Sequence, residues 1–233
     1  MKTVLITGVT SGLGKEIAQK FVRKGWNVIG LGRNTAQLVA MQMELGRLFS
    51  PFEVDISNSI KLEACFQKIL LNFPVLDVLI NNAAVFKLKE FDQCTIGDID
   101  NIIDTNLKGP MYCTLLALRS IKRESGRIVN ISSVAGTHGI KLQSIYCASK
   151  FGLNGFGQAL GQELLDRGIS LTTISPGGIN TPLWSEENNP YPGENKEKLI
   201  QPNELAKMVE RIVELPSNMV VKDIVVFPSN EWH

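Results

Sequence analysis

Short apolar runs alternate along this chain with longer segments in which apolar residues recur at helical spacing. A continuous apolar run of this kind is typical of a strand that is buried on both faces of a parallel sheet. We predict seven strands on this basis, over residues 4–6, 27–32, 52–55, 75–81, 127–133, 170–175 and 223–227. Helices are predicted between them, over residues 15–24, 35–46, 57–73, 95–120, 145–166 and 202–215.

Strands and helices that alternate throughout a chain predict an α/β fold, here a three-layer, doubly wound parallel sheet of about seven strands. The 233 residues suit a single domain over residues 1–233, because no repeat, low-complexity segment or second-domain boundary is visible. Residues 182–201 are irregular and contain three prolines. We predict that they form a lid over a substrate pocket, with a plain surface connection as the alternative.

Composition and charge favour a small-molecule partner. A net charge of +1 creates no field that would attract nucleic acid or an anionic membrane surface. The four cysteines and two histidines lack the spacing of a metal site or a disulfide framework, so we expect no bound metal and a reducing compartment. The N-terminal apolar run is too short for a signal segment, and no later run is long enough to span a membrane. A cytoplasmic protein is therefore expected.

A glycine-rich turn follows the first predicted strand. Its glycines form a G-x-x-x-G-x-G pattern directly before a predicted helix. Glycine permits a sharp turn and a close approach of the backbone to a ligand, and a helix N-terminus presents free N–H groups to a pyrophosphate. A turn without a ligand is the alternative. The candidate cofactor contacts here are Gly8, Thr10, Ser11, Gly12, Leu13 and Gly14.

Further candidate contacts follow the next three strands. Arg33 and Asn34 stand where an NAD site would place an acidic residue on the ribose 2′-hydroxyl, and a guanidinium suits a 2′-phosphate instead. We therefore predict NADP (NADPH), with NAD and a solvated Arg33 as the alternative. Asp55 and Ile56, at the end of the third strand, form a place where the adenine can rest. The mostly small residues Asn82, Ala83 and Ala84 follow the fourth strand and let a cofactor ring or ribose come close. Asn81 is expected to bond the backbone, with a ligand contact as the alternative.

Tyr146 and Lys150 are four residues apart, which on a helix places both side chains on one face. A phenol has a pKa of about 10, and a nearby ammonium favours the phenolate and lowers that pKa. Such a tyrosine exchanges a proton with an alcohol or carbonyl oxygen. Ser133, at the end of the fifth strand, is placed to bond the same oxygen. A half-buried tyrosine beside a solvated lysine is the alternative.

Two features of the predicted helices bear on the site. Pro110 interrupts the helix over 95–120, and because proline lacks an N–H, the main-chain carbonyl of Asn106 loses its helical partner. That carbonyl and the Asn106 carboxamide are placed to anchor a water, although a simple bend is the alternative. The helix over 145–166 contains several glycines, which indicates that another helix packs closely on it, from this chain or from a second subunit.

In this order and spacing the motifs resemble the short-chain dehydrogenases/reductases along nearly the whole chain, and a Rossmann-like fold is implied. The matching elements are the glycine turn, Asp55, Asn81-Asn-Ala, Asn106, Ser133, Tyr146-x-x-x-Lys150, and Pro176-Gly177 followed by Thr181. The resemblance also brings Ile179 into the expected cofactor site. Three features depart from the family pattern, namely Ala84 in place of a commoner glycine, a compact segment after Thr181, and a rather short chain.

The resemblance implies that Asn106, Ser133, Tyr146 and Lys150 form the catalytic set of an NADP-dependent oxidoreductase. In it Tyr146 exchanges the proton, Ser133 polarises the substrate oxygen, Lys150 lowers the Tyr146 pKa and binds the nicotinamide ribose, and the Asn106 carbonyl holds a water. A homodimer or homotetramer is expected. From chain position we expect the substrate, a small carbonyl or alcohol, to meet Ser133, His138, Gln143 and Trp184, with Ser144, Phe86 and Leu183 nearby. The rival functions are an NAD-linked dehydrogenase and a non-catalytic NADP(H)-binding sensor or scaffold.

Overall fold

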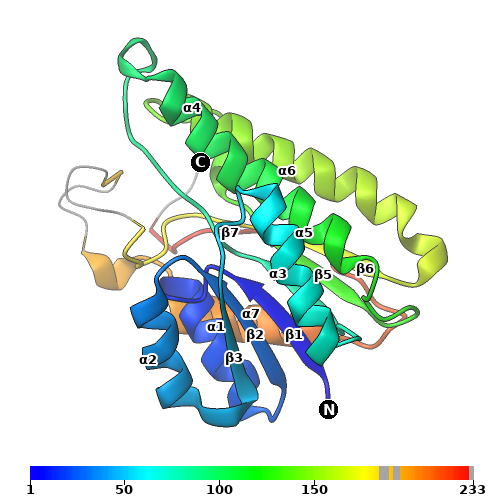
Figure 1. The fold of residues 1–233 in the computed structure, drawn as a ribbon. Coiled ribbons are helices and arrows are strands. Elements are labelled where there is room, and N and C mark those ends of the chain that lie inside the picture. Colours follow the sequence, from blue (N-terminus) through cyan, green and yellow to red (C-terminus); the bar gives the residue numbers. More distant parts are fainter. Residues whose placement is uncertain (184–188, 191–194, 231–233) are drawn as a thin grey trace.

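The computed structural model describes residues 1–183, 189–190 and 195–230. Its strands form one sheet in the order β3-β2-β1-β4-β5-β6-β7, and every neighbouring pair is parallel (Figure 1). The strands are β1 (Thr3–Thr7), β2 (Asn27–Gly32), β3 (Phe49–Glu53), β4 (Val78–Asn81), β5 (Arg127–Ile131), β6 (Ser170–Pro176) and β7 (Asp223–Val226). The predicted seven-stranded, doubly wound α/β fold is therefore confirmed.

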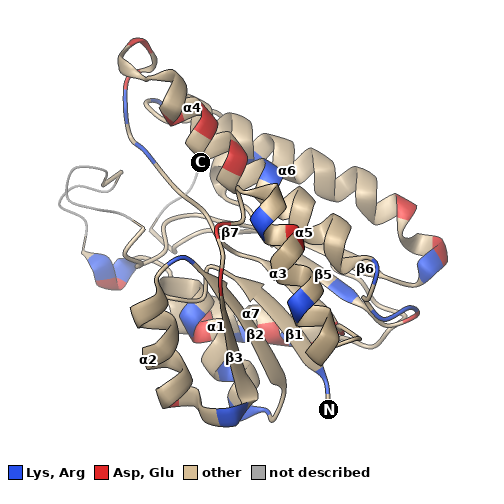
Figure 2. Ribbon diagram, viewed as in Figure 1, with Lys and Arg blue, Asp and Glu red and all other residues tan. Residues whose placement is uncertain are grey.

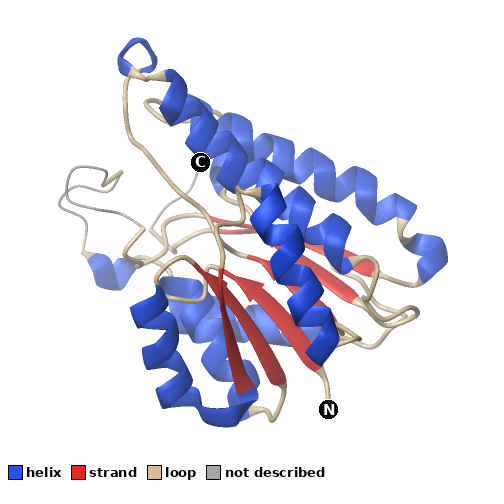
Figure 3. Cartoon of the chain, in the orientation of Figure 1, coloured by secondary structure: helices blue, strands red, loops and turns tan. Residues whose placement is uncertain are grey.

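Helices cover both faces of the sheet (Figure 3). One apolar core joins the sheet to α1 (Gly12–Arg23), α2 (Thr35–Leu45) and α7 (Pro202–Val213). The other joins it to α3 (Ser59–Asn72), α5 (Gly109–Ala117) and the C-terminal part of α6 (Ser144–Glu163). Helix α4 (Ile96–Ile103) lies beside α6.

The first strand shows why a short apolar run becomes a central strand. Val4 and Ile6 point into one core and Leu5 into the other, and all three are fully buried. Because successive side chains of a strand point to opposite faces, only a continuous apolar run satisfies a sheet that helices cover on both sides.

The strand order reverses between β1 and β4, since β1 leads outward to β2 and β3 while β4 leads to β5, β6 and β7. The two connections leave the sheet on opposite faces, so a crevice opens at the carboxyl ends of the central strands. In doubly wound sheets ligands bind in this crevice. The topology therefore places the loops after β1, β2, β4, β5 and β6 around one site.

Several predicted boundaries are wrong, and strand pairing explains that of β3. Strand β3 spans Phe49–Glu53 and not 52–55, because its residues pair in register with Val28 to Gly32 of β2. Strand β5 ends at Ile131 and not at 133, so Ser133 lies in the loop beyond the sheet. Strand β4 begins at Val78 rather than at 75, and α1 begins at Gly12 rather than at 15.

The helix predicted over 95–120 is divided into three parts. Thr95 caps α4 through a capping box with Asp98, a π turn (η3) spans Asp104–Lys108, and α5 follows. The N–H of Gly109 bonds the carbonyl of Asp104, five residues back. The helix therefore accommodates Pro110 by inserting a wider turn directly before it, and such turns are frequent at functional sites.

Two further expectations concern parts of the chain beyond the sheet. Residues 184–188 and 191–194 of the predicted lid lie outside the described residues, and Lys196–Lys198 in its described end form a short 3-10 turn. No helix in the described ranges is long and apolar enough to cross a membrane. Basic and acidic residues are interspersed along the described helices (Figure 2).

Candidate active site

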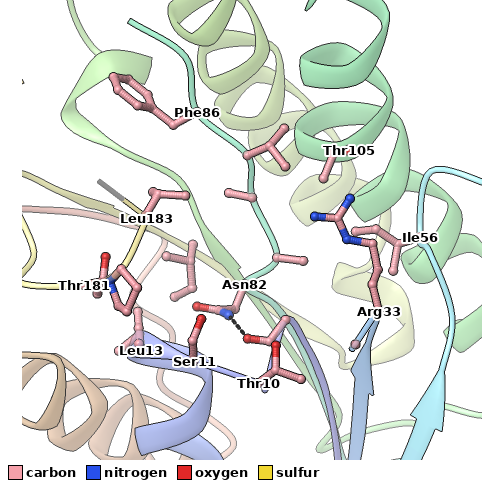
Figure 4. A pocket seen from close by; sticks show the side chains of 18 of the residues that line it. Thr10, Ser11, Leu13, Arg33, Ile56, Asn82, Phe86, Thr105, Thr181 and Leu183 are labelled. Atoms are coloured by element: carbon pink, nitrogen blue, oxygen red, sulfur yellow. Dashed lines mark hydrogen bonds between the residues drawn. The ribbon is translucent and has the colours of Figure 1, made fainter. Parts of the chain in front are cut away.

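A cavity of about 1000 Å³ lies at the carboxyl ends of the central strands (Figure 4). Nearly all the residues predicted to touch a cofactor line it, although they come from five separate loops and from α6. These lining residues are Gly8, Thr10, Ser11, Gly12, Leu13, Arg33, Asn34, Asp55, Ile56, Asn82, Ala83, Ala84, Tyr146, Lys150, Pro176, Gly177, Ile179 and Thr181, together with Ser133. Gly14 and Asn106 are not among the lining residues, and each has a different role.

The glycine turn between β1 and α1 is built from backbone that other residues rarely adopt. Gly8 and Gly12 have φ values of +70° and +52°. A Cβ at Gly14 would lie 2.1 Å from the Gly8 carbonyl oxygen, so Gly14 packs the turn against the start of α1 and does not face the cavity. The N-terminal residues of α1 do face it. Their N–H groups form the anion-binding end of a helix.

Asn82 fixes the shape of the glycine turn. Its Nδ2 donates to the carbonyl oxygens of Thr7 and Gly8, at 2.9 and 3.1 Å, and the Thr7 Oγ1 accepts from the N–H groups of Asn82 and Ala83. These bonds tie the loop after β4 to the loop after β1.

The prediction that Asn81 bonds the backbone is wrong, because the Asn81 side chain points into the core and donates to Thr114 Oγ1 and Asn130 Oδ1.

Arg33 reaches the cavity from the end of β2 (Figure 4). Its side chain is 59% exposed, and Nη1 lies 3.6 Å from Asp55 Oδ2. Burial works to raise the pKa of Asp55, but the N–H and hydroxyl of Ser57 and the nearby guanidinium outweigh it, so that pKa is lowered. Asp55 is therefore ionised and holds one edge of a guanidinium that has five N–H donors. Asn34 caps α2 by accepting from the Gln37 N–H.

Ser133, Tyr146 and Lys150 meet at the other end of the cavity. Ser133 begins a 3-10 turn after β5, its Oγ accepts from the Ala135 N–H, and its side chain hydrogen-bonds the Tyr146 hydroxyl. Lys150 Nζ donates to the Ile131 carbonyl oxygen at 3.0 Å and lies 5.6 Å from the centroid of the Tyr146 ring. Tyr146 and Lys150 are 4% and 2% exposed.

Burial dominates the electrostatics of this pair. It raises the pKa of Tyr146, and the Ser133 hydrogen bond offsets only part of the effect. It also lowers the pKa of Lys150 to about 7. The prediction of a lowered Tyr146 pKa is therefore wrong for this arrangement, because Lys150 Nζ is directed at a carbonyl and the loss of hydration of the phenolate outweighs the Ser133 hydrogen bond. The site instead contains a protonated phenol beside a lysine that titrates near neutrality.

Asn106 has a structural task. The side chain is fully buried; Oδ1 accepts from the Val85 N–H at 2.8 Å, and Nδ2 donates to the Val85 carbonyl at 2.8 Å and to Ser149 Oγ at 3.3 Å. The expectation that the carboxamide anchors a water is wrong, because both its ends hold the segment after β4. A water on the main-chain carbonyl stays a prediction.

The predicted substrate contacts are only partly assembled. Phe86 and Leu183 line the cavity, and the Phe86 ring meets that of Tyr146 edge to face, with centroids 5.0 Å apart. His138 and Gln143 are absent from the described wall. His138 Nδ1 lies 3.2 Å from Thr137 Oγ1, and Gln143 lines a small separate cavity beside Lys87 and Asp98. Trp184 lies outside the described residues.

Other lining residues were not predicted from the sequence, among them Val85, Asn101, Thr105, Ile131 and Ser132. Thr105 directly precedes Asn106, and only Pro110 hints at the π turn that brings it to the wall. Among the described residues no group of three or more His, Cys, Asp or Glu is placed to hold a metal ion.

Comparisons with known proteins agree with this geometry. A family model described as short chain dehydrogenase matches residues 2–192. A serine 3-dehydrogenase of Agrobacterium fabrum is 30% identical over 98% of this chain and 94% of its own, and an NADPH-dependent pterin aldehyde reductase of Arabidopsis thaliana is 34% identical over 78% and 76%. A solved closed form of serine dehydrogenase complexed with NADP⁺ is 25% identical and superposes with a TM-score of 0.88 over 99% of this chain and 96% of the other.

Proposed function

The chain belongs to the short-chain dehydrogenase family of oxidoreductases, and we propose that it transfers a hydride between NADP and a small carbonyl or alcohol, with Tyr146 exchanging the proton. The family that the sequence motifs indicated is thus confirmed. The observation that carries the proposal is one continuous cavity with Arg33 at one end and Tyr146 and Lys150 at the other. Such a cavity suits an elongated dinucleotide whose two halves need different partners.

The shape of the cavity wall supports the fit of a dinucleotide. A Cβ at Gly8 would lie 2.7 Å from the Ala83 Cα, and one at Gly12 would lie 3.0 Å from the Thr181 side chain. These glycines therefore let the loops after β1, β4 and β6 pack closely around the start of α1, and the pyrophosphate would be held at the N–H groups of that helix. Ala84 lines the same wall, so the residue that departs from the family pattern still admits a cavity of this size.

The remaining candidate contacts divide between the two halves of the cofactor. Arg33 and Asn34 would hold the 2′-phosphate, and Asp55 and Ile56 would border the adenine. At the other end Lys150 would hold the nicotinamide ribose, and the loop after β6 would hold the carboxamide side through Pro176, Gly177, Ile179 and Thr181. When bound, the nicotinamide supplies or accepts the hydride.

NADP is preferred over NAD because of the charge at the end of β2. Arg33 contacts Asp55 through one nitrogen at 3.6 Å and is 59% exposed, so a phosphate can be added to its free edge without breaking a buried pair. Guanidinium–phosphate contacts are strong and directional. The pterin aldehyde reductase named above uses NADPH, and the serine dehydrogenase structure contains NADP⁺, which supports the same choice.

In the carbonyl-reducing direction Tyr146 acts as the general acid. Burial keeps its hydroxyl protonated, and the hydroxyl lies at the cavity wall within hydrogen-bonding contact of Ser133. A substrate oxygen between the two hydroxyls would be polarised by Ser133 and would take its proton from Tyr146. Lys150, with a pKa of about 7, is suited to return a proton to the phenol near neutral pH. Phe86 packs on the Tyr146 ring and helps to keep water from the reacting groups.

A screen of purified protein tests the proposal. Ketones, aldehydes and alcohols, with L-serine included because of the named relative, are incubated with NADPH or NADP⁺ and followed by cofactor absorbance. We expect turnover of at least one compound class, with NADPH preferred over NADH. NADPH binding without turnover of any compound would favour the sensor or scaffold alternative, and equal use of both cofactors would overturn the choice of NADP.

A further inference from the structure

We infer that Thr105 is a cofactor-binding residue, whose hydroxyl hydrogen-bonds the edge of the adenine ring; the inference rests on the proposed NADP site. Thr105 lies on the π turn between α4 and α5 and is 5% exposed. Its side chain lines the large cavity, near Ile56 and the Arg33 guanidinium (Figure 4). Its Oγ1 makes no hydrogen bond to any described residue.

An unpaired hydroxyl in this position is unusual. A helical threonine ordinarily satisfies its hydroxyl by donating to the carbonyl three or four residues back. A buried hydroxyl without any partner is unfavourable, and each such group in a native structure calls for an explanation. Thr114, on the following helix α5, is also buried, but its hydroxyl has a partner, because its Oγ1 accepts from Asn81 Nδ2. The Thr105 hydroxyl, buried beside the cavity, therefore has no protein partner among the described residues to give up when a ligand binds there.

The π turn gives neighbouring residues different tasks. Asn106 bonds Val85 and Ser149 and does not line the cavity, while Thr105 forms part of the cavity wall. Asn101, four residues before Thr105, also lines the cavity, so one face of this helix forms part of the wall. Thr105 lies within the π turn that precedes Pro110, so the turn that accommodates the proline also sets the position of Thr105.

The neighbours of Thr105 identify which half of the ligand it would meet. A Cβ at Gly109 would lie 2.7 Å from Ile56 Cδ1, which shows that Ile56 packs against the start of α5 beside Thr105. Ile56 and Asp55 follow β3, and Arg33 follows the adjacent β2, so this end of the cavity is the adenosine end. An adenine edge offers ring nitrogens that accept and an amine that donates, and a threonine hydroxyl can serve either.

The test compares Thr105→Val with Thr105→Ser in the full-length protein. The probe is adenosine 2′,5′-bisphosphate, which carries the adenine and the 2′-phosphate without the nicotinamide, and its Kd is measured by calorimetry beside that of NADPH. We expect Thr105→Val to weaken both Kd values roughly fivefold, as the loss of one hydrogen bond predicts, and Thr105→Ser to stay within about twofold of wild type. The thermal midpoint of unliganded Thr105→Val should equal or exceed that of wild type.

Thr114→Val is the matched control, because its hydroxyl already has a partner. We expect it to lower the thermal midpoint and to leave both Kd values unchanged. Wild-type Kd values for Thr105→Val, or a lowered midpoint without a change in Kd, would overturn the inference while leaving the NADP site intact. If wild type binds neither NADPH nor the bisphosphate, the proposed function itself fails.

Discussion

Lys150 Nζ lies 5.6 Å from the centroid of the Tyr146 ring, and both side chains are almost fully buried. The two residues are one turn apart on α6, so helix geometry alone fixes their separation. The sheet supplies the rest, since the end of β5 offers the Ile131 carbonyl to Lys150 and the following loop offers Ser133 to Tyr146. A proton-transfer group is thus held between a helix and a strand end.

Burial of Lys150 predicts a specific dependence of stability on pH. The pKa of Lys150 is about 7 in the folded protein and 10.5 as the ordinary value, so between these limits the unfolded chain binds more protons. The free energy of unfolding should therefore rise as pH rises from about 7 toward 10. Lys150→Met should be more stable than wild type near pH 7, and this difference should shrink toward pH 10. Urea unfolding across this range measures the effect.

Lys68→Met is the control for the pH series, because Lys68 is exposed on α3. Its stability should follow that of wild type at every pH. A Lys150→Met protein whose stability changes with pH in parallel with wild type would show that Lys150 keeps an ordinary pKa in the folded state.

The choice between cofactors depends on Arg33. Arg33→Ala should weaken NADPH binding by roughly tenfold to a hundredfold, because a charge-assisted contact to the 2′-phosphate is lost, and should leave NADH binding nearly unchanged. Fluorescence titration of both cofactors provides the two Kd values. Arg47→Ala, at an exposed position just after α2, should bind both cofactors as wild type does. An equal loss for NADPH and NADH would place Arg33 elsewhere in the site.

Asn106 should matter for stability as well as for activity. Asn106→Leu has a similar volume but leaves the Val85 N–H and carbonyl without their partners, so we expect the free energy of unfolding to fall by about 2–4 kcal/mol. Chemical denaturation measures this loss. Asn72→Leu, at the exposed end of α3, should change stability by no more than about 0.5 kcal/mol. A stable Asn106→Leu protein would show that the Val85 contacts contribute little.

Two glycines on α6 should respond in opposite directions to alanine. A Cβ at Gly157 would lie 2.6 Å from Thr173 Oγ1 on β6, whereas a Cβ at Gly155 meets nothing within 4 Å. Gly157→Ala should therefore destabilise the fold, and Gly155→Ala should raise the free energy of unfolding by about 1 kcal/mol in a monomer through helix propensity. Thermal denaturation of both variants checks this. Destabilisation by Gly155→Ala would indicate that a second subunit packs there.

These glycines also show where sequence reasoning reached its limit. The glycine-rich composition of the helix predicted close packing by another helix, and Gly152 does pack in this way, against Leu107 of the π turn. Gly157, however, makes room for a strand. The glycines in the sequence indicate that another part of the chain packs closely on this helix. Whether that part is a helix or a strand depends on the tertiary fold, which the local sequence does not encode.

The same division holds for the site. Gly8, Arg33 and Tyr146 were predictable because strand–turn–helix order brings strand ends to one edge of a parallel sheet. The Tyr146 pKa was not, because it depends on how much water the fold removes. The hydrogen bonds between Asn106 and Val85, and the place of Thr105 in the cavity wall, follow from a π turn that has no sequence signature beyond Pro110.

The most direct test of the whole account is the turnover of Tyr146→Phe with NADPH and an active carbonyl substrate. This change removes only a hydroxyl, so NADPH should bind as it does to wild type, and Tyr112→Phe serves as the control with normal turnover. Because the Ser133 hydroxyl would still bond the substrate oxygen but is a much weaker acid than a phenol, it would not replace the lost proton donor, and we expect kcat to fall by at least a hundredfold. A Tyr146→Phe protein that turns over at a rate near wild type would contradict the role of Tyr146 as the proton donor.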